Sequence, residues 1–282
     1  MNYYRCENPD CGFLAEEEPD VCPRCGGTFF LAVDEEEMTG SDWVQLGNRA
    51  VDEGRDTDAL ACYQQAAALD DLLGITNLGW CLEAGIGVEA DPRQAVVLYA
   101  QAAARDYMPA LTNLGYCYAY GIGVAHDDAK ALECFRKGAE QGFPRAQSLL
   151  GDCLQAGRGT EQDQARAVSL YQQAADQGYL PAVCDLGLCY ECGDGVEMDK
   201  PKAVALYRRA AESGYARAQC NLGFCLLHGL GTETDISQAL EWLKRAAERK
   251  YPRALDLLGD CCWNGDVVQR DDQAAVAYYR QG

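Results

Sequence analysis

The chain has 282 residues, 48% of them hydrophobic, and a formal net charge of −20. Length and composition suit one large folded domain or two, and no stretch approaches the roughly 18 consecutive apolar residues that a membrane helix needs. A surface this acidic repels phosphate backbones and anionic lipids, so we expect neither nucleic acid nor membrane as a partner. The first residues hold no apolar run of the kind found in secretory signals, and we therefore expect a cytoplasmic protein.

The first segment in chain order, residues 1–32, carries two pairs of cysteines. Cys6 and Cys11 are separated by four residues, and Cys22 and Cys25 lie in a Cys-Pro-Arg-Cys turn followed by two glycines. Two such pairs provide the four thiolates of a tetrahedral metal site. A segment of about 30 residues is too short for an adequate apolar core, so metal binding would supply much of its folding energy.

Residues 4–30 resemble the rubredoxin-like zinc ribbons. The resemblance implies one structural zinc ion held by the four cysteines. Ribbons with two Cys-x-x-Cys knuckles can instead carry iron for electron transfer, which leaves a redox protein as an alternative function. The first knuckle here departs from that pattern because it has four intervening residues, and the chain has only two histidines, His126 and His228. We therefore favour zinc over iron.

An acidic linker is predicted at residues 33–40. Residues 1–40 hold ten acidic residues against two arginines, a net charge of −8. Ribbons in other proteins bind nucleic acid, but this charge speaks against that role. Two interpretations stay open: the ribbon is an acidic docking module, or it is an N-terminal cap packed on the domain that follows.

From residue 41 to residue 282 the sequence repeats. A Leu-Gly pair recurs every 36 residues, followed by a cysteine three residues after the leucine, a glycine seven after it and an aspartate thirteen after it. In five of the six units an alanine stands four residues before the leucine. The anchor leucines are Leu78, Leu114, Leu150, Leu186, Leu222 and Leu258.

Each unit is predicted to be a helix–loop–helix hairpin. Ala146, Leu150 and Leu154 recur at a spacing of four and give the first helix one apolar stripe. The glycine reaches the left-handed conformation at small cost and ends this helix. The aspartate is a favoured N-cap and begins the second helix, whose own stripe includes Ala167 and Tyr171. One hairpin cannot bury these stripes alone, but a stack of hairpins can.

Six full units and a shorter first one around Leu46 and Gly47 predict seven hairpins and fourteen helices. The repeats resemble the Sel-one-like repeat (SLR) family, a relative of the tetratricopeptide repeat. Residues 110–142 read ALTNLGYCYAYGIGVAHDDAKALECFRKGAEQG and follow the family pattern almost throughout. The resemblance implies an all-α fold, a right-handed α/α superhelical solenoid that serves as a scaffold for protein complexes.

In related solenoids the first helices line a concave groove in which partners dock. By that analogy the groove positions are the second, fifth and sixth residues after each anchor leucine. We predict eight partner-binding residues there: Trp80, Tyr116, Tyr120, Leu188, Phe224, Leu227, His228 and Trp263. Such a groove suits a helix or an extended peptide, with aromatic side chains as hot spots. The alternative is that several of these side chains pack between neighbouring hairpins.

The twelve cysteines within the repeats are predicted to be reduced and buried in the core. Adjacent packed helices lie roughly 8–10 Å apart, whereas a disulfide needs Cα atoms about 4.4–6.8 Å apart. Buried reduced cysteine behaves as a small hydrophobe. We therefore expect these residues to contribute packing and not chemistry.

No catalytic constellation is recognisable in the sequence. The Gly-x-Gly elements lack the Lys-Ser or Lys-Thr pair of a phosphate-binding loop, and His126 is expected in a loop. We therefore expect a protein-binding scaffold or adaptor and not an enzyme. A redox protein is the first alternative, and a hydrolase, as proposed for some secreted relatives, is the second. The partner and the oligomeric state are left open.

Overall fold

The computed structural model describes residues 3–6, 8, 11, 13–15, 19–26, 28, 30–265 and 269–281. The chain forms two compact units, Met1–Cys134 (unit 1) and Phe135–Gly282 (unit 2). Fourteen α-helices lie in the described residues, and none of them is both long and apolar enough to span a membrane. Their bounds are α1 Gly40–Asp52, α2 Asp56–Ala68, α3 Leu72–Ala84, α4 Pro92–Ala103, α5 Met108–Tyr120, α6 Asp128–Glu140, α7 Pro144–Ala156, α8 Gln164–Asp176, α9 Leu180–Cys192, α10 Lys200–Glu212, α11 Ala216–His228, α12 Ile236–Glu248, α13 Pro252–Asn264 and α14 Asp272–Tyr279.

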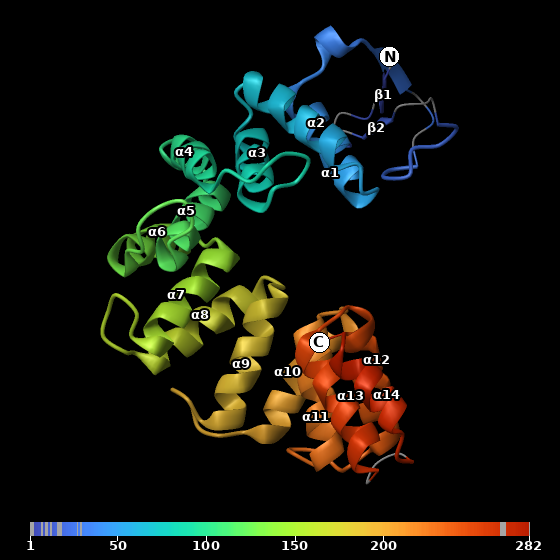
Figure 1. The fold of residues 1–282 in the computed structure, drawn as a ribbon. Coiled ribbons are helices and arrows are strands. Elements are labelled where there is room, and N and C mark those ends of the chain that lie inside the picture. The colour runs from blue at the N-terminus through green and yellow to red at the C-terminus, as the bar shows by residue number, and fades with distance from the viewer. Residues whose placement is uncertain are drawn as a thin grey trace. The chain divides into compact units, whose positions relative to one another are not determined.

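A small antiparallel sheet precedes the helices (Figure 1). Its strands are β1 (Tyr3–Cys6), β2 (Leu14–Ala15) and β3 (Phe30–Val33), in the order β2-β1-β3. A short 3-10 helix, η1 (Glu35–Glu37), leads to α1. The predicted linker thus contains the last residue of β3 and this turn of helix; its exact boundaries stay predictions.

The helices form sequential hairpins whose boundaries are those predicted from the repeat. The first helices α3, α5, α7, α9, α11 and α13 each end at the predicted glycine, with φ between 66° and 82°. The recurring aspartate accepts a hydrogen bond from a backbone N–H in the first turn of the following helix, for example from Lys202 to Asp199 at 2.9 Å. Seven hairpins, and the glycine and aspartate caps of the six full units, are therefore confirmed, while the right-handed superhelical winding stays a prediction.

An aromatic ring explains the glycine that follows most anchor leucines. A Cβ added to Gly187 on α9 would lie 2.6 Å from Cε1 of Tyr207 on α10, well inside contact distance. The same close approach recurs at Gly47–Tyr63, Gly79–Tyr99, Gly151–Tyr171 and Gly259–Tyr279. Glycine therefore lets the second helix place its tyrosine directly on the backbone of the first.

Each of these tyrosines also donates its hydroxyl to a polar side chain on the first helix of its own hairpin. Tyr207 donates to Glu191 at 2.6 Å, and Tyr99 donates to Glu83 at 2.8 Å. The other pairs are Tyr63 with Asn48, Tyr171 with Asp152 and Tyr279 with Asp260, each at 2.7 Å. This role could not be predicted from the sequence, because nothing in the spacing shows which polar side chain meets which hydroxyl.

The cysteine prediction holds for most of the repeat cysteines and fails for Cys192. All sixteen cysteines lie in the described residues, and none forms a disulfide. Of the twelve in the repeats, nine are buried, Cys62 and Cys262 are half-buried, and Cys192 is exposed at the end of α9. Burial raises the pKa of Cys117 and of Cys189 to about 12, which keeps these thiols neutral and unreactive.

Candidate functional site

The structure brings the four ribbon cysteines together. Their sulfur atoms all lie within 4.8 Å of one another. Cys6 Sγ is 3.6 Å from Cys25 Sγ, and Cys11 Sγ is 3.5 Å from Cys22 Sγ. A tetrahedral ion with metal–sulfur bonds of about 2.3 Å has sulfur–sulfur edges of about 3.8 Å, so these four side chains fit a single metal ion.

Backbone hydrogen bonds shape the two cysteine turns. The N–H of Cys11 donates to the carbonyl of Asn8 at 2.9 Å, and the N–H of Gly26 donates to the carbonyl of Cys22 at 2.8 Å. Arg24 lies in the second turn and donates to the carbonyl of Cys11 at 2.7 Å, which joins the two turns. The thiols are thus held in place by the local chain.

Three of the four thiols are buried, and Cys25 is exposed. Burial raises the pKa of Cys11 to about 12, and the neighbouring thiols of Cys22 and Cys25 raise it further against the hydrogen bond from the Phe13 backbone. Without a cation, such a group holds its proton. A metal ion would displace the protons, since thiolates are the form that binds.

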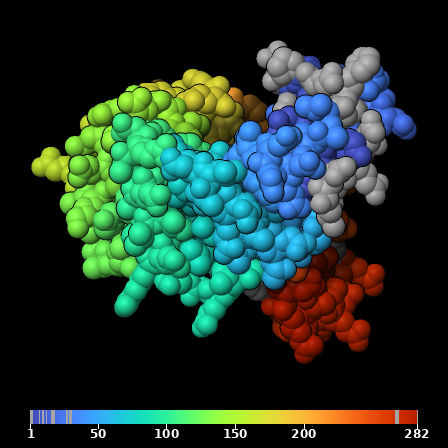
Figure 2. All heavy atoms as spheres, turned by 90° about the horizontal axis from the view of Figure 1, so that it is seen from above, coloured from blue at the N-terminus to red at the C-terminus, as the bar shows by residue number. Residues whose placement is uncertain are grey.

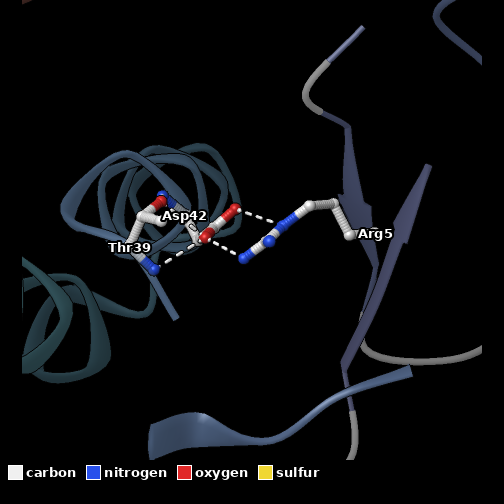
Figure 3. A network of polar contacts seen from close by, with 3 residues as sticks. All are labelled: Arg5, Thr39 and Asp42. Carbon is white, nitrogen blue, oxygen red and sulfur yellow. Dashed lines mark hydrogen bonds and ion pairs between the residues drawn. The ribbon is translucent and has the colours of Figure 1, made fainter. Parts of the chain in front are cut away.

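An ion pair fixes the ribbon to the first hairpin (Figure 3). Arg5, next to the ligand Cys6, donates from its guanidinium to both oxygens of Asp42, at 3.3 and 2.5 Å. Asp42 is only 3% exposed and also accepts from the N–H of Thr39 at 2.8 Å, in the capping box that begins α1. Arg5 therefore compensates a buried carboxylate at the start of the solenoid.

Apolar packing joins the same two parts. Tyr3, Leu14 and Val33 of the sheet form one cluster with Met38 and Leu46. In Figure 1 the strands β1 and β2 lie beside α1, and in Figure 2 the darkest blue atoms, at the start of the chain, adjoin the lighter blue atoms that follow them. Of the two interpretations of the ribbon, packing as an N-terminal cap is the one that these contacts support.

None of the eight predicted partner-binding side chains is buried. In unit 1, Trp80 on α3 is 38% exposed, Tyr120 on α5 is 53% exposed, and Tyr116 is half-buried. In unit 2, Trp263 is 48% exposed and His228 is exposed, whereas the other three are half-buried: Leu188, Phe224 and Leu227. These residues stay candidates for binding on the first helices of each unit.

The two units differ in what lies over these rings. In unit 2, the guanidinium of Arg253 lies 5.3 Å from the centre of the Phe224 ring, and that of Arg270 lies 5.4 Å from the Trp263 ring. In unit 1, no lysine or arginine of the described residues lies over Trp80, whereas the rings of Tyr116 and Tyr120 contact each other at 4.4 Å. Within the described residues, the ring of Trp80 thus has no cation over it, although Lys130 lies over the neighbouring Tyr118.

The surroundings of Asp152, on the first-helix face of α7, disfavour the ionised form of its carboxyl group. Burial raises its pKa to about 6, the nearby Asp185 adds to the shift, and the hydrogen bond from Tyr171 opposes it. An unfolded chain releases this proton near pH 4. Between about pH 4 and pH 6 the folded protein therefore binds more protons than the unfolded chain, and the free energy of unfolding falls as the pH rises.

We expect Asp152→Asn to raise the free energy of unfolding by about 1–2 kcal/mol at pH 7 and to change it little at pH 4. The amide keeps an oxygen for the Tyr171 hydroxyl and carries no charge. Urea unfolding at the two pH values measures the effect, with the exposed Asp256→Asn as the matched control. An equal gain at both pH values would show that ionisation of Asp152 is not the cause.

The fold and the cysteine cluster together define a helical-hairpin repeat protein with an N-terminal four-cysteine cluster that could bind a metal. The chain belongs to the Sel1 repeat family. The family's repeat matches residues 52–71, 73–107, 109–143, 144–179, 180–215, 216–251 and 252–282. The ribbon lies outside these matches and is an addition to the repeats.

Several solved structures are similar to this chain. A Sel1 repeat protein from Oxalobacter formigenes is 34% identical, with a TM-score of 0.72, over 84% of this chain and 97% of the relative. The protective antigen c5321 of uropathogenic Escherichia coli, which has the SLR fold, is 30% identical, with a TM-score of 0.62, over 87% of this chain and 54% of that protein. The immunity protein Pa5087 of Pseudomonas aeruginosa, at 20% identity and a TM-score of 0.53 over 74% of this chain and 80% of that protein, shares the fold. Among curated proteins, none matches this chain.

Proposed function

We propose that the protein is a binding scaffold whose first-helix faces hold a partner protein or peptide. The observation that carries the proposal is the exposure of large aromatic side chains, Trp80, Tyr120 and Trp263, at the repeat positions where related solenoids bind partners. Exposed aromatic side chains of this kind are frequent hot spots in interfaces. The repeats already have an apolar core without them, formed by leucines of the first helices such as Leu114 and Leu258 and by tyrosines of the second helices such as Tyr99 and Tyr207.

We propose that this scaffold has no catalytic role and acts in the cytoplasm. Both histidines are exposed and have ordinary neighbours: His126 lies 3.2 Å from Asp128, and the ring of His228 lies 4.4 Å from that of Phe224. Glu83 and Glu191 accept the hydroxyls of buried tyrosines, so the repeated carboxylates have a structural explanation. These contacts favour a scaffold over a hydrolase.

Affinity capture from an extract of the native host tests the scaffold proposal. The double variant Trp80→Ala with Phe224→Ala should lose proteins that the wild type retains, since both changes remove aromatic contacts from first-helix faces. The matched control is Val97→Ala with Met198→Ala, which removes one exposed apolar side chain from each unit outside those faces. If wild type and both double variants retain the same proteins, the first-helix faces are not the binding surface.

We further propose that the ribbon holds one structural zinc ion. Four thiolates in a tetrahedron suit zinc, and they also suit a single iron. Packing of the ribbon as a cap supports a structural metal, because the ion then stabilises the contacts of Arg5 and Leu14 with α1. Elemental analysis and an absorption spectrum separate the alternatives: zinc is colourless, whereas a ferric thiolate site is coloured and would favour the redox function.

A further inference from the structure

A small pocket opens on the first-helix face of unit 1, between α1 and α3. Its volume is about 220 Å³, below the roughly 300–1,000 Å³ of pockets that enclose drug-sized ligands. It therefore suits one side chain with the adjoining peptide backbone. The lining residues are Asn48, Val51, Asp52, Tyr63, Asn77 and Trp80.

The two asparagines of the pocket have unused hydrogen-bonding capacity. Asn48 Oδ1 accepts from the Tyr63 hydroxyl at 2.7 Å and from Asn77 Nδ2 at 3.4 Å. In the described part of the chain, Asn48 Nδ2 and Asn77 Oδ1 have no partner. One free donor and one free acceptor side by side match the carbonyl and the N–H of a peptide backbone.

The negative charge of unit 1 determines which kind of peptide can bind there. Unit 1 holds 24 acidic residues against seven lysines and arginines, a net charge of −17, whereas unit 2 holds 20 against 17, a net charge of −3. Several of the seven basic side chains are already paired, such as Arg5 with Asp42 and Arg105 with Asp70. Unit 1 therefore attracts cations and repels a second copy of this acidic chain.

Within the pocket, Asp52 is an exposed carboxylate beside Trp80. A carboxylate and an aromatic face together favour a cation, the first by charge and the second through the quadrupole of the ring. In unit 2 the ring at the equivalent repeat position, Phe224, has Arg253 over it, and the ring of Trp263, at another first-helix position, has Arg270 over it. The ring of Trp80 lacks this contact with a cation.

We propose that this pocket takes a lysine or arginine side chain from an extended basic segment of a partner protein. Trp80 contacts the aliphatic stem and the cation, Asp52 pairs with the charge, and Asn48 and Asn77 bind the adjoining peptide unit. The inference rests on the proposed scaffold function and names the chemistry of the partner for unit 1.

Fluorescence anisotropy with short labelled peptides tests the assignment. One peptide alternates lysine with serine, and a second has glutamate in place of every lysine. We expect the lysine peptide to bind the full-length protein with an affinity that falls with added salt, and the glutamate peptide not to bind. Trp80→Ala should weaken binding at least about tenfold, with Trp80→Phe retaining most of it and circular dichroism confirming that both variants fold.

Two control variants separate the pocket from the overall charge. Asp52→Asn should weaken binding about three- to tenfold, while Glu89→Gln, which removes the same charge from an exposed loop residue, and Trp263→Ala in unit 2 should leave it within about twofold. Equal losses for Asp52→Asn and Glu89→Gln, or none for Trp80→Ala, would overturn the assignment of the pocket.

The outcomes also separate this inference from the proposed function. If proteins captured from the host require Trp80 but the glutamate peptide binds at least as tightly as the lysine peptide, the basic partner is wrong and the scaffold function stands. If the Trp80→Ala, Phe224→Ala double variant captures the same proteins as the wild type, the scaffold proposal fails as well.

Discussion

Removal of the metal from the four-cysteine cluster is expected to unfold the ribbon and loosen the first hairpin, while the hairpins of unit 2 stay folded. Inside the ribbon, the buried cysteines with Phe13 form a cluster of their own, so without an ion the two turns would be held by a few backbone hydrogen bonds and the bond from Arg24 to Cys11. Structural zinc contributes about 10–16 kcal/mol of apparent binding free energy in small zinc-finger peptides. The free energy lost with the ion should therefore exceed the stability that so small a segment has without it.

The effect should reach α1 through Arg5. When β1 unfolds, the carboxylate of Asp42 loses the guanidinium of Arg5. It remains in the capping box of α1 and is therefore still shielded from water. Because Arg5 is itself 30% exposed, losing this partner should cost less than the about 3–5 kcal/mol of a fully buried ion pair. Tyr3 and Leu14 would also leave Leu46, so apolar surface of the first hairpin would become exposed to water.

Hydrogen–deuterium exchange before and after treatment with a chelator measures this result. Protection should be lost in residues 3–33 and fall in α1 and α2, but persist in α9 to α12. Cys22→Ser should give the same pattern without chelator, whereas Cys192→Ser, an exposed cysteine outside the cluster, should not. Arg5→Ala with the metal retained should loosen α1 alone. Unchanged protection of α1 in the metal-free protein would mean that the ribbon does not support the solenoid.

Gly187→Ala is expected to lower the free energy of unfolding by about 1–3 kcal/mol. Helix propensity alone predicts the opposite sign, because alanine is favoured over glycine in a helix interior by about 1 kcal/mol. The new methyl group would lie 2.6 Å from Cε1 of Tyr207, a ring that is fully buried and donates its hydroxyl to Glu191. The ring therefore cannot move aside without breaking its hydrogen bond to Glu191.

A double-mutant cycle with Tyr207→Leu tests the cause. If the ring is responsible, Gly187→Ala should cost less in the Tyr207→Leu background than in the wild type, with a coupling energy above about 0.5 kcal/mol. Urea unfolding of the four proteins provides the values. A stabilising effect of Gly187→Ala in the wild type would contradict the packing explanation.

Much of the architecture follows from local chemistry that is legible in the residues themselves. A glycine ends a helix because of its backbone freedom, and an aspartate begins one because its carboxylate accepts a nearby N–H. Both residues recur every 36 positions, so the hairpins, their boundaries and their number could be predicted. The four ribbon cysteines could be recognised for the same reason, since the metal chemistry depends on residue type and short spacing.

The contacts between distant residues could not be predicted in this way. The pairing of Arg5 with Asp42, the acceptor of each tyrosine hydroxyl, the exposure of Cys192 and the pocket beside Trp80 all depend on how separate helices and strands pack. A period shows that positions are equivalent, but not which side chain each one meets. For this reason the sequence could not show that Glu83 and Glu191 accept the hydroxyls of buried tyrosines, and the ribbon's role as a cap rests on its contacts with α1.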